Sequence, residues 1–251
     1  MSQPELLLRG QGLTRRWGGL IAVDQVSIDL ARGEVHAVIG TNGASKSTLI
    51  NMLPGELAPS AGQVELLGQD ATGWSQPRRA RAGLGRSYQR TTLYPSFSVF
   101  ENCRLAAQAQ SPMPWRIWLS AQRCAQSGSA ARDAVQRSGL DKLLDREAGL
   151  LSHGQKRQLE IAMCLATTPQ VLLLDEPLAG MGAEETERML ALLDELKTDH
   201  ALLLVEHDMD AVFRIAERIT VMVKGAIVAS GDPEHVRSSP EVRTAYLGEE
   251  D

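Results

Sequence analysis

The sequence has few features of an extracellular, redox-active or membrane-spanning protein. Its 251 residues include only three cysteines, Cys103, Cys124 and Cys164, which are widely separated and form no Cys-x-x-Cys pair. This spacing favours ordinary buried or surface thiols over a metal or redox site. The apolar runs have only strand length, well short of the roughly 20 residues of a transmembrane helix, and the first residues do not resemble an export signal. We therefore expect a cytosolic protein.

The chain also lacks the excess of basic residues that nucleic-acid-binding proteins usually carry. It has 26 Lys and Arg against 31 Asp and Glu, which gives a formal net charge of -5. No nucleic-acid partner is therefore expected. Positive charge gathers locally at Arg78, Arg79 and Arg81, followed by Arg86 and Arg90. We interpret this cluster as the solvated face of a helix rather than a patch for nucleic acid.

Length and apolar patterning predict an α/β domain built around a largely parallel sheet. Residues 171–175, 201–206 and 219–223 have the pattern of buried strands. Helical patterns over 184–197 and 208–217 separate these strands. Strands and helices that alternate in this way are typical of a sheet covered on both faces.

Two regions depart from this alternation. Up to about residue 68 short strands alternate with glycine-containing turns, which predicts a β-rich first part. These apolar runs cover residues 6–8, 26–30, 35–39 and 64–67. From about residue 90 to 150 the pattern is helical, with Pro112 and Pro114 interrupting it. We expect a helical subdomain inserted there, within a single domain that spans residues 1–251.

The strongest functional signal is a phosphate-binding loop between a strand and a helix. The segment from Gly40 to Thr48 reads GTNGASKST and follows the apolar run 35–39. Backbone N–H groups of such a loop surround phosphate oxygens, the Lys46 ammonium neutralises their charge, and the Ser47 hydroxyl is suited to Mg²⁺. The predicted binding residues are Gly40, Asn42, Gly43, Ala44, Ser45, Lys46, Ser47 and Thr48.

The alternative is an ordinary Asn42-Gly43 turn followed by an exposed lysine at a helix start. The later motifs make this alternative remote. The loop also departs from the usual pattern, which has glycine immediately before the lysine, because Ser45 occupies that position. A non-glycine residue there puts full catalytic competence in question.

Two carboxylates follow the apolar run 171–174. Asp175 and Glu176 are predicted to project from the carboxyl edge of the sheet, where ligands bind in open α/β folds. Such a pair offers a place for a divalent metal and for a base. The local alternative is an acidic helix start before Pro177.

A Ser-x-Gly-Gln turn opens a predicted helix at Ser152. Ser152 and Gln155 have capping-box spacing, which stabilises a helix start without any ligand. Gly154 favours an additional role, because a residue without Cβ lets the backbone approach a phosphate closely. Both interpretations are compatible.

Taken in order, these elements resemble the ATP-binding subunits of ABC transporters over nearly the whole chain. The resemblance includes an aromatic residue before two glycines at Trp17, the phosphate loop, Gln89, the Ser152 turn, the Asp175 strand end and His207. Residues 83–90 (GLGRSYQR), 179–181 (AGM) and 245–250 (AYLGEE) resemble the branched-chain amino acid and urea importer branch. The resemblance implies ATP and Mg²⁺ as cofactors.

The resemblance also implies roles for single residues. Asp175 and Gln89 would join Ser47 at Mg²⁺, and Glu176 would polarise the attacking water. His207 would contact the γ-phosphate and order that water. Trp17 would stack on adenine, although it could simply pack between strands.

The same resemblance implies the fold and the partners. The fold is a P-loop NTPase core with a mostly parallel sheet, an N-terminal antiparallel β subdomain and an inserted helical subdomain. Two such subunits would sandwich two ATP molecules, with the turn formed by Ser152, Gly154 and Gln155 reaching the ATP of the second subunit. Transmembrane permease subunits would hold the protein on the inner face of the cell membrane, and an external solute-binding protein would act indirectly.

ATP hydrolysis would then drive the import of branched-chain or hydrophobic amino acids, or of a similar small solute such as urea. Two alternatives remain. One is a soluble or non-hydrolysing ATP-gated clamp, which Ser45 keeps open. The other is the ATP-binding subunit of a different ABC system, such as one for lipopolysaccharide export.

Overall fold

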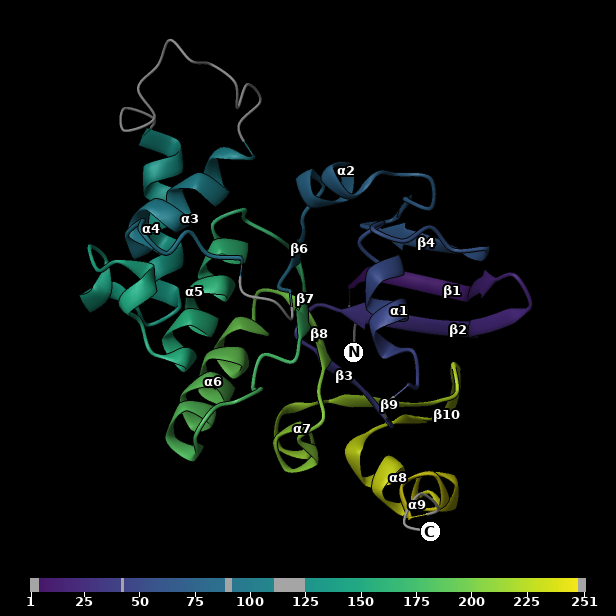
Figure 1. Ribbon diagram of the computed structural model, residues 1–251. Helices are drawn as coiled ribbons and strands as arrows, with labels where there is room; N and C mark the ends of the chain where they lie inside the picture. The colour runs from purple at the N-terminus through teal and green to yellow at the C-terminus, as the bar shows by residue number, and fades with distance from the viewer. Residues whose placement is uncertain (1–4, 42, 89–91, 111–124, 248–251) are drawn as a thin grey trace.

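A six-stranded sheet forms the centre of the computed structural model, which describes residues 5–41, 43–88, 92–110 and 125–247 (Figure 1). Its strand order is β10-β9-β3-β8-β7-β6, and only β10 pairs in an antiparallel manner. The strands are β3 (Val35–Gly40), β6 (Leu84–Arg86), β7 (Val171–Asp175), β8 (Ala201–Val205), β9 (Arg218–Val223) and β10 (Ala226–Gly231). The predicted mostly parallel sheet is therefore confirmed.

A second, antiparallel sheet lies in the N-terminal part of the chain, as predicted from the resemblance. Its order is β2-β1-β4-β5. The strands are β1 (Leu6–Trp17), β2 (Leu20–Ala31), β4 (Ala61–Leu66) and β5 (Gln69–Asp70). The predicted short strands 6–8 and 26–30 were wrong in length, since β1 and β2 each have 12 residues. Register shifts between Gly10 and Leu13 interrupt the apolar alternation, so the sequence pattern underestimates these strands.

Helices cover both faces of the central sheet. Figure 1 shows α3, α4 and α5 grouped on one side, with α1 and the antiparallel sheet on the other. The helices are α1 (Lys46–Met52), α2 (Gln76–Arg81), α3 (Val99–Gln108), α4 (Ala125–Arg137), α5 (His153–Leu165), α6 (Ala183–Leu196), α7 (Met209–Ile215), α8 (Pro233–Ser238) and α9 (Pro240–Leu247). Helices α3 and α4 lie within the interval 90–150, for which an inserted helical subdomain stays a prediction.

The hydrophobic core divides along the two faces of this sheet. On β7, Leu172 and Leu174 belong to the cluster with the α3–α7 side, whereas Val171 and Leu173 belong to the cluster with α1 and the antiparallel sheet. Successive side chains of a strand point to opposite faces, so a strand buried on both faces is apolar throughout. The unbroken apolar runs in the sequence have this cause.

The strand order also decides where the polar strand ends meet. β8 lies between β3 and β7, and the three strands run parallel. Their carboxyl ends therefore share one edge of the sheet. The segments after Gly40, Asp175 and Val205 start there, which brings the phosphate loop beside the predicted acidic residues.

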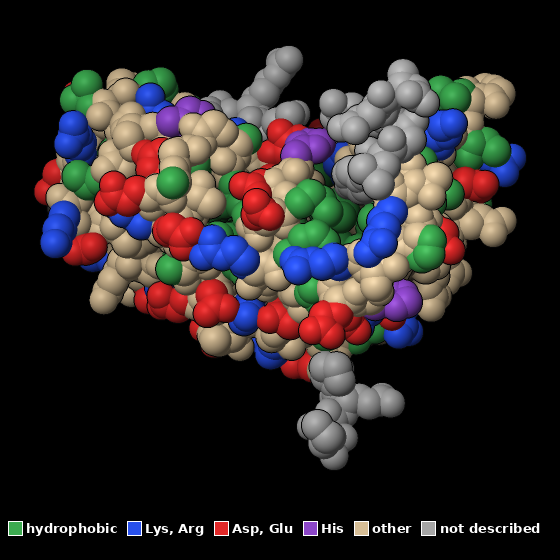
Figure 2. Space-filling model, turned by 90° about the horizontal axis from the view of Figure 1, so that it is seen from below, with side chains coloured by type: hydrophobic (Ala, Val, Ile, Leu, Met, Phe, Trp, Pro, Cys, Tyr) green, Lys and Arg blue, Asp and Glu red, His purple; other side chains and the backbone are tan. Residues whose placement is uncertain are grey.

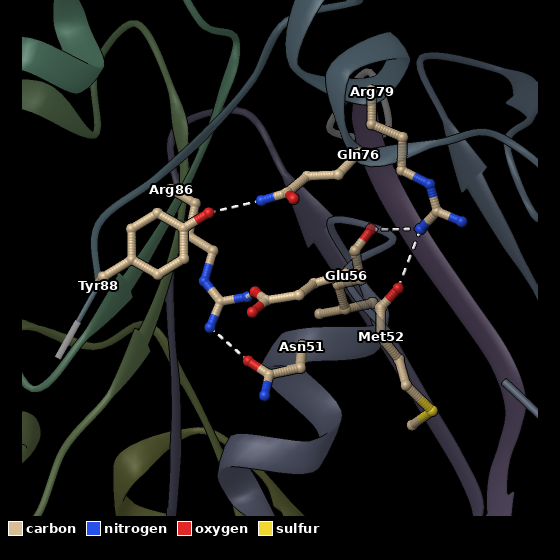
Figure 3. Close-up of polar contacts among 8 residues, drawn as sticks. Asn51, Met52, Glu56, Gln76, Arg79, Arg86 and Tyr88 are labelled. Carbon is tan, nitrogen blue, oxygen red and sulfur yellow. Dashed lines mark hydrogen bonds and ion pairs between the residues drawn. The ribbon is translucent and has the colours of Figure 1, made fainter. Parts of the chain in front are cut away.

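The arginine cluster was interpreted wrongly at Arg79. Its side chain is 1% exposed and donates hydrogen bonds to Met52 O at 3.0 Å and Leu53 O at 2.5 Å (Figure 3). It also donates to Thr72 O at 3.0 Å. Carbonyl groups at the end of a helix have no partner within the helix. Arg79 caps the end of α1 in this way, and burial lowers its pKa. Helical periodicity alone does not reveal such acceptors.

Cys103 and Cys164 are buried, and burial raises the pKa of each thiol to about 12, whereas Cys124 lies outside the described residues. Figure 2 shows Asp and Glu side chains interspersed with Lys and Arg on the face seen from below.

Within the described ranges, none of the helices combines the length and the apolar character that crossing a membrane would require.

Candidate nucleotide-binding and hydrolysis site

The phosphate loop connects β3 to α1 and encloses its lysine. Lys46 is 6% exposed, and its Nζ donates hydrogen bonds to Gly40 O at 2.6 Å and to Thr41 O at 3.1 Å. Burial lowers the pKa of Lys46, while the negative charges of Glu176 and Asp175 act in the opposite direction. The ammonium and both carboxylates therefore share one electrostatic environment, as expected for a phosphate and metal site.

Close backbone packing fixes the start of this loop. A Cβ at Gly40 would lie 2.2 Å from Met222 O on β9, so only glycine fits there. Ala44 is buried, whereas Gly43 and Ser47 are exposed. Ser47 and Thr48 lie in the first turn of α1, where free backbone N–H groups favour anions. Asn42 lies outside the described residues.

Ser45 has a left-handed backbone conformation, which the glycine usual at this position adopts without strain. Its φ is 66° and its ψ is 24°, immediately before the first residue of α1. A non-glycine residue in this region stores about 1–3 kcal/mol of strain. The Ser45 side chain makes no capping hydrogen bond to the helix that would offset this cost.

Replacing Ser45 by glycine is therefore expected to relieve backbone strain in the phosphate loop. Ser45→Gly should tighten nucleotide binding or raise turnover by roughly tenfold, the factor that about 1.4 kcal/mol represents. ATP titration and phosphate release, measured on both forms, check this expectation. Gln25→Gly is the matched control, because Gln25 also has a positive φ of 51° but lies on β2. Equal or poorer values for Ser45→Gly would show that the loop accepts serine without penalty.

The residues after β7 and β8 bring a carboxylate and a histidine together. Glu176 Oε1 lies 2.7 Å from His207 Nε2, and Glu176 N donates to Val205 O at 2.9 Å. Glu176 has a φ of 50°, a strained conformation that aims its side chain at this edge. Because a carboxylate accepts, the Nε2 nitrogen of His207 carries the proton in this pair. Asp175 is 6% exposed, and burial raises its pKa.

Sequence reasoning missed Glu206, which holds these two segments together. Glu206 is 3% exposed, and it accepts hydrogen bonds from Leu178 N at 2.8 Å and His207 N at 3.1 Å. Burial raises the pKa of this carboxyl. Its position directly after the apolar run 202–205 was the available signal. Glu206 thereby fixes the distance between the Glu176 and His207 segments.

The turn at Ser152 has the predicted capping box. Ser152 Oγ accepts from Gln155 N at 3.2 Å, and Gln155 Oε1 accepts from Ser152 N at 3.0 Å. Gly154 is buried in the first turn of α5. The Ser152 hydroxyl also donates to Glu185 Oε1 at 3.0 Å, a contact that sequence reasoning missed. Within the described residues the turn is therefore occupied by a carboxylate of its own chain.

The segment that leads to Gln89 is held by contacts on three sides. Gln89 itself lies outside the described residues. Before it, the Tyr88 hydroxyl accepts from Gln76 at 2.5 Å, and the Tyr88 ring lies 4.8 Å from the Arg86 guanidinium (Figure 3). The Tyr88 carbonyl accepts from Arg157 of α5 at 3.2 Å. Tyr88, the residue directly before Gln89, is therefore fixed by its side chain and by its backbone.

Arg86 extends this network to the helix of the phosphate loop. It donates to Asn51 Oδ1 on α1 and to Glu56 Oε2 at 2.6 Å (Figure 3). Its side chain is only 7% exposed, although Glu56 is 43% exposed. The network joins the end of β6 to α1, which the sequence does not indicate.

Trp17 ends β1 with 46% of its surface exposed. The Arg15 guanidinium lies 5.1 Å from its ring. This exposure does not favour packing between strands, the alternative considered for Trp17. An aromatic face of this kind is available to a planar ligand.

The fold and these motifs define an ATP-binding cassette. Residues 23–179 match the sequence profile of the ABC transporter family, and residues 226–251 match that of the branched-chain amino acid ATP-binding cassette transporters. The chain belongs to the ABC transporter family and is an ATP-binding ATPase of that family.

Relatives with curated names match the chain from end to end. The high-affinity branched-chain amino acid transport ATP-binding protein LivG of Salmonella typhimurium is 40% identical over 99% of this chain and 100% of its own length. LivG of Escherichia coli K12 has the same identity and coverage, and BraF of Pseudomonas aeruginosa is 37% identical over 99% of this chain and its own full length.

Solved structures agree with this assignment. The ADP conformation of an ATP-binding cassette of an ABC transporter has a TM-score of 0.86 at 30% identity and covers 97% of this chain and 99% of its own. A nucleotide-free cassette has a TM-score of 0.85 at 29% identity and covers 96% and 98%. The predicted family and fold are confirmed.

Proposed function

We propose that this chain is the ATP-hydrolysing subunit of an importer for branched-chain or similar hydrophobic amino acids. The observation that carries this proposal is the 40% identity to LivG over 99% of the chain. The match of residues 226–251 to the branched-chain amino acid family supports the same solute class. The alternative solute is a small polar molecule such as urea.

Binding of ATP begins at the phosphate loop in this proposal. The backbone N–H groups of the loop and the first turn of α1 bind the phosphate oxygens. Lys46 neutralises the β- and γ-phosphates, because its buried ammonium is poorly solvated and already faces negative charge. Trp17 binds the adenine ring through its exposed face.

Mg²⁺ is proposed to bind near Lys46, whose pKa responds to the charge of Asp175. Ser47 and Asp175 are the proposed ligands, Asp175 through water, and Gln89 is the proposed third. In the described part of the chain, His, Cys, Asp and Glu form no group of three or more that could hold a metal alone. That arrangement suits an ion that also depends on nucleotide phosphates and water. Mg²⁺ would neutralise charge on the phosphates.

Hydrolysis is proposed to depend on the Glu176 and His207 pair. The water oxygen forms a bond to the γ-phosphorus while the bond to the β-γ bridging oxygen breaks, which yields ADP and phosphate. Glu176 accepts the proton of this water. His207 Nε2 lies 2.7 Å from Glu176 Oε1 and orients the carboxylate. His207 is also proposed to contact the γ-phosphate.

The proposed transporter combines this chain with a second ATP-binding subunit, permease subunits and a solute-binding protein. A second ATP-binding subunit, identical or related, presents its own turn of Ser152, Gly154 and Gln155 to the γ-phosphate. Transmembrane permease subunits carry the solute and hold this chain on the inner face of the membrane. An external solute-binding protein delivers the solute to them.

Transport in proteoliposomes tests the function. The chain is co-purified with its membrane subunits and reconstituted with ATP on its own side and the solute-binding protein on the other, and uptake of labelled leucine and labelled urea is assayed. ATP-dependent leucine uptake is the expected result. Association with membrane subunits that move lipid or lipopolysaccharide would contradict it, and an absence of steady-state phosphate release would favour the clamp.

An exposed aromatic pair marks the proposed contact with the permease. Tyr94 and Phe97 are 49% and 38% exposed, and their rings stack at 5.3 Å. Asn102, which is buried, accepts from Tyr94 N at 2.9 Å and donates to Tyr94 O at 3.1 Å. The pair is therefore positioned before any partner binds, which lowers the cost of association.

Replacing this pair is expected to separate assembly from hydrolysis. Tyr94→Ser with Phe97→Ser should weaken co-purification with the membrane subunits by at least about tenfold, because buried aromatic anchors dominate interfaces. ATP hydrolysis by the isolated subunit should change little. Leu105→Ser is the control, since Leu105 is also exposed, at 37%, but lies on α3 and is not part of the aromatic pair. Lost ATP affinity with normal assembly would mean that the contact surface lies elsewhere.

A further inference from the structure

A carboxylate of the same chain sits against the start of α5. The Ser152 hydroxyl donates to Glu185 Oε1 at 3.0 Å. A Cβ built on Gly154 would lie 2.6 Å from the carboxyl carbon of Glu185 and 2.7 Å from its Oε1. The Glu185 carboxylate therefore lies against the backbone of Gly154, on the exposed side of the turn.

This location has the electrostatics of an anion site. The first N–H groups of a helix lack partners within it and carry partial positive charge, so carboxylates and phosphates are stabilised there. The Ser152 hydroxyl has one proton. Because that proton is donated to Glu185, the hydroxyl has none left for another acceptor, while its oxygen accepts from Gln155 N.

We propose that Glu185 acts as an internal competitor for the γ-phosphate of the ATP held by the second subunit. The proposal rests on the proposed function, in which the Ser152 turn binds that phosphate across a dimer. Glu185 must withdraw before the phosphate docks, since two negative groups at one helix start repel each other. The contact raises the ATP concentration needed for dimer closure and leaves ATP binding to the single subunit unchanged.

A purely structural role for Glu185 has to be separated from this one. Glu185 lies in the first turn of α6, where an acidic residue also stabilises the helix dipole. Glu184 lies in the same turn, but it pairs with Arg188 and its side chain is 82% exposed. Glu184→Gln therefore removes one charge from the same turn without touching Ser152, which makes it the matched control.

The test compares ATP-driven dimerisation with ATP binding for wild type, Glu185→Gln and Glu184→Gln. Dimer formation is followed by sedimentation as a function of ATP with EDTA present, and binding is followed with a fluorescent ATP analogue at low protein concentration. Glu185→Gln should lower the half-maximal ATP for dimerisation by about tenfold, equivalent to about 1.4 kcal/mol. Its single-subunit affinity and the behaviour of Glu184→Gln should match wild type.

A second variant keeps the charge and shortens the side chain. Glu185→Asp should show a smaller shift than Glu185→Gln, because its carboxylate stays near α5 but loses reach to Ser152. No shift, or a higher ATP requirement, in Glu185→Gln would overturn the proposal. An equal shift in Glu184→Gln would overturn it as well, since net charge would then be the cause. Failure of the proposed dimer, on which this inference rests, is distinguishable, because wild type itself would then not dimerise at any ATP concentration.

Discussion

Glu176→Gln is expected to lower ATP turnover by roughly 10²–10⁴-fold, the usual contribution of a positioned general base. The amide keeps the size of the side chain but cannot accept the proton of the attacking water. ATP binding should persist, because Lys46 and the phosphate loop are unchanged. The variant should also accumulate as an ATP-bound dimer. Steady-state phosphate release, ATP affinity and sedimentation measure these three properties.

The control for this variant is Glu195→Gln, which makes the same chemical change at an exposed position on α6. It should hydrolyse ATP like wild type. Normal phosphate release by Glu176→Gln would exclude Glu176 as the base. The hydrogen bond to His207 would then have only a structural role.

The second large effect concerns the stability of α5. Arg157 and Glu160 form an ion pair at 2.8 Å, with side chains only 9% and 5% exposed. Glu160→Ala should lower the free energy of unfolding by about 3–5 kcal/mol, because it removes one partner of a buried ion pair. Urea unfolding of the isolated subunit measures this change.

An exposed pair of the same residue types provides the control. Glu184 and Arg188 pair on α6 with side chains 82% and 61% exposed, and Glu184→Ala should change stability little because water screens the pair. Replacing Arg157 and Glu160 together by leucine should recover most of the lost stability. If Glu160→Ala unfolds at the same urea concentration as Glu184→Ala, the buried pair contributes little.

Several features of the candidate site could be predicted from residues that are close together in the sequence. The lysine of a phosphate loop, the backbone conformation required at Ser45 and the capping box at Ser152 depend on neighbours within a few residues. Strand ends at Asp175 and Val205 were predictable for a related reason, since a strand buried on both faces is apolar until it leaves the sheet.

Contacts between segments that are distant in the sequence could not be predicted in this way. The Arg79 guanidinium is buried because carbonyls of Met52, Leu53 and Thr72 converge on it. Nothing in the local pattern of residues 76–81 distinguishes this arginine from an exposed one. The lengths of β1 and β2 were missed because register shifts within the pair disturb the alternation on which the prediction relied.

The sequence by itself determined the family and the parallel core, and it named the residues that we propose bind the phosphates, because each depends on short-range patterns in a recognisable order. Only the tertiary structure placed His207 against Glu176, Glu206 between their two segments and Glu185 against Ser152. These contacts join residues about thirty positions apart or depend on the order of the strands. Their geometry arises when β7 and β8 pair and α6 packs beside α5, and short-range patterning does not contain that information.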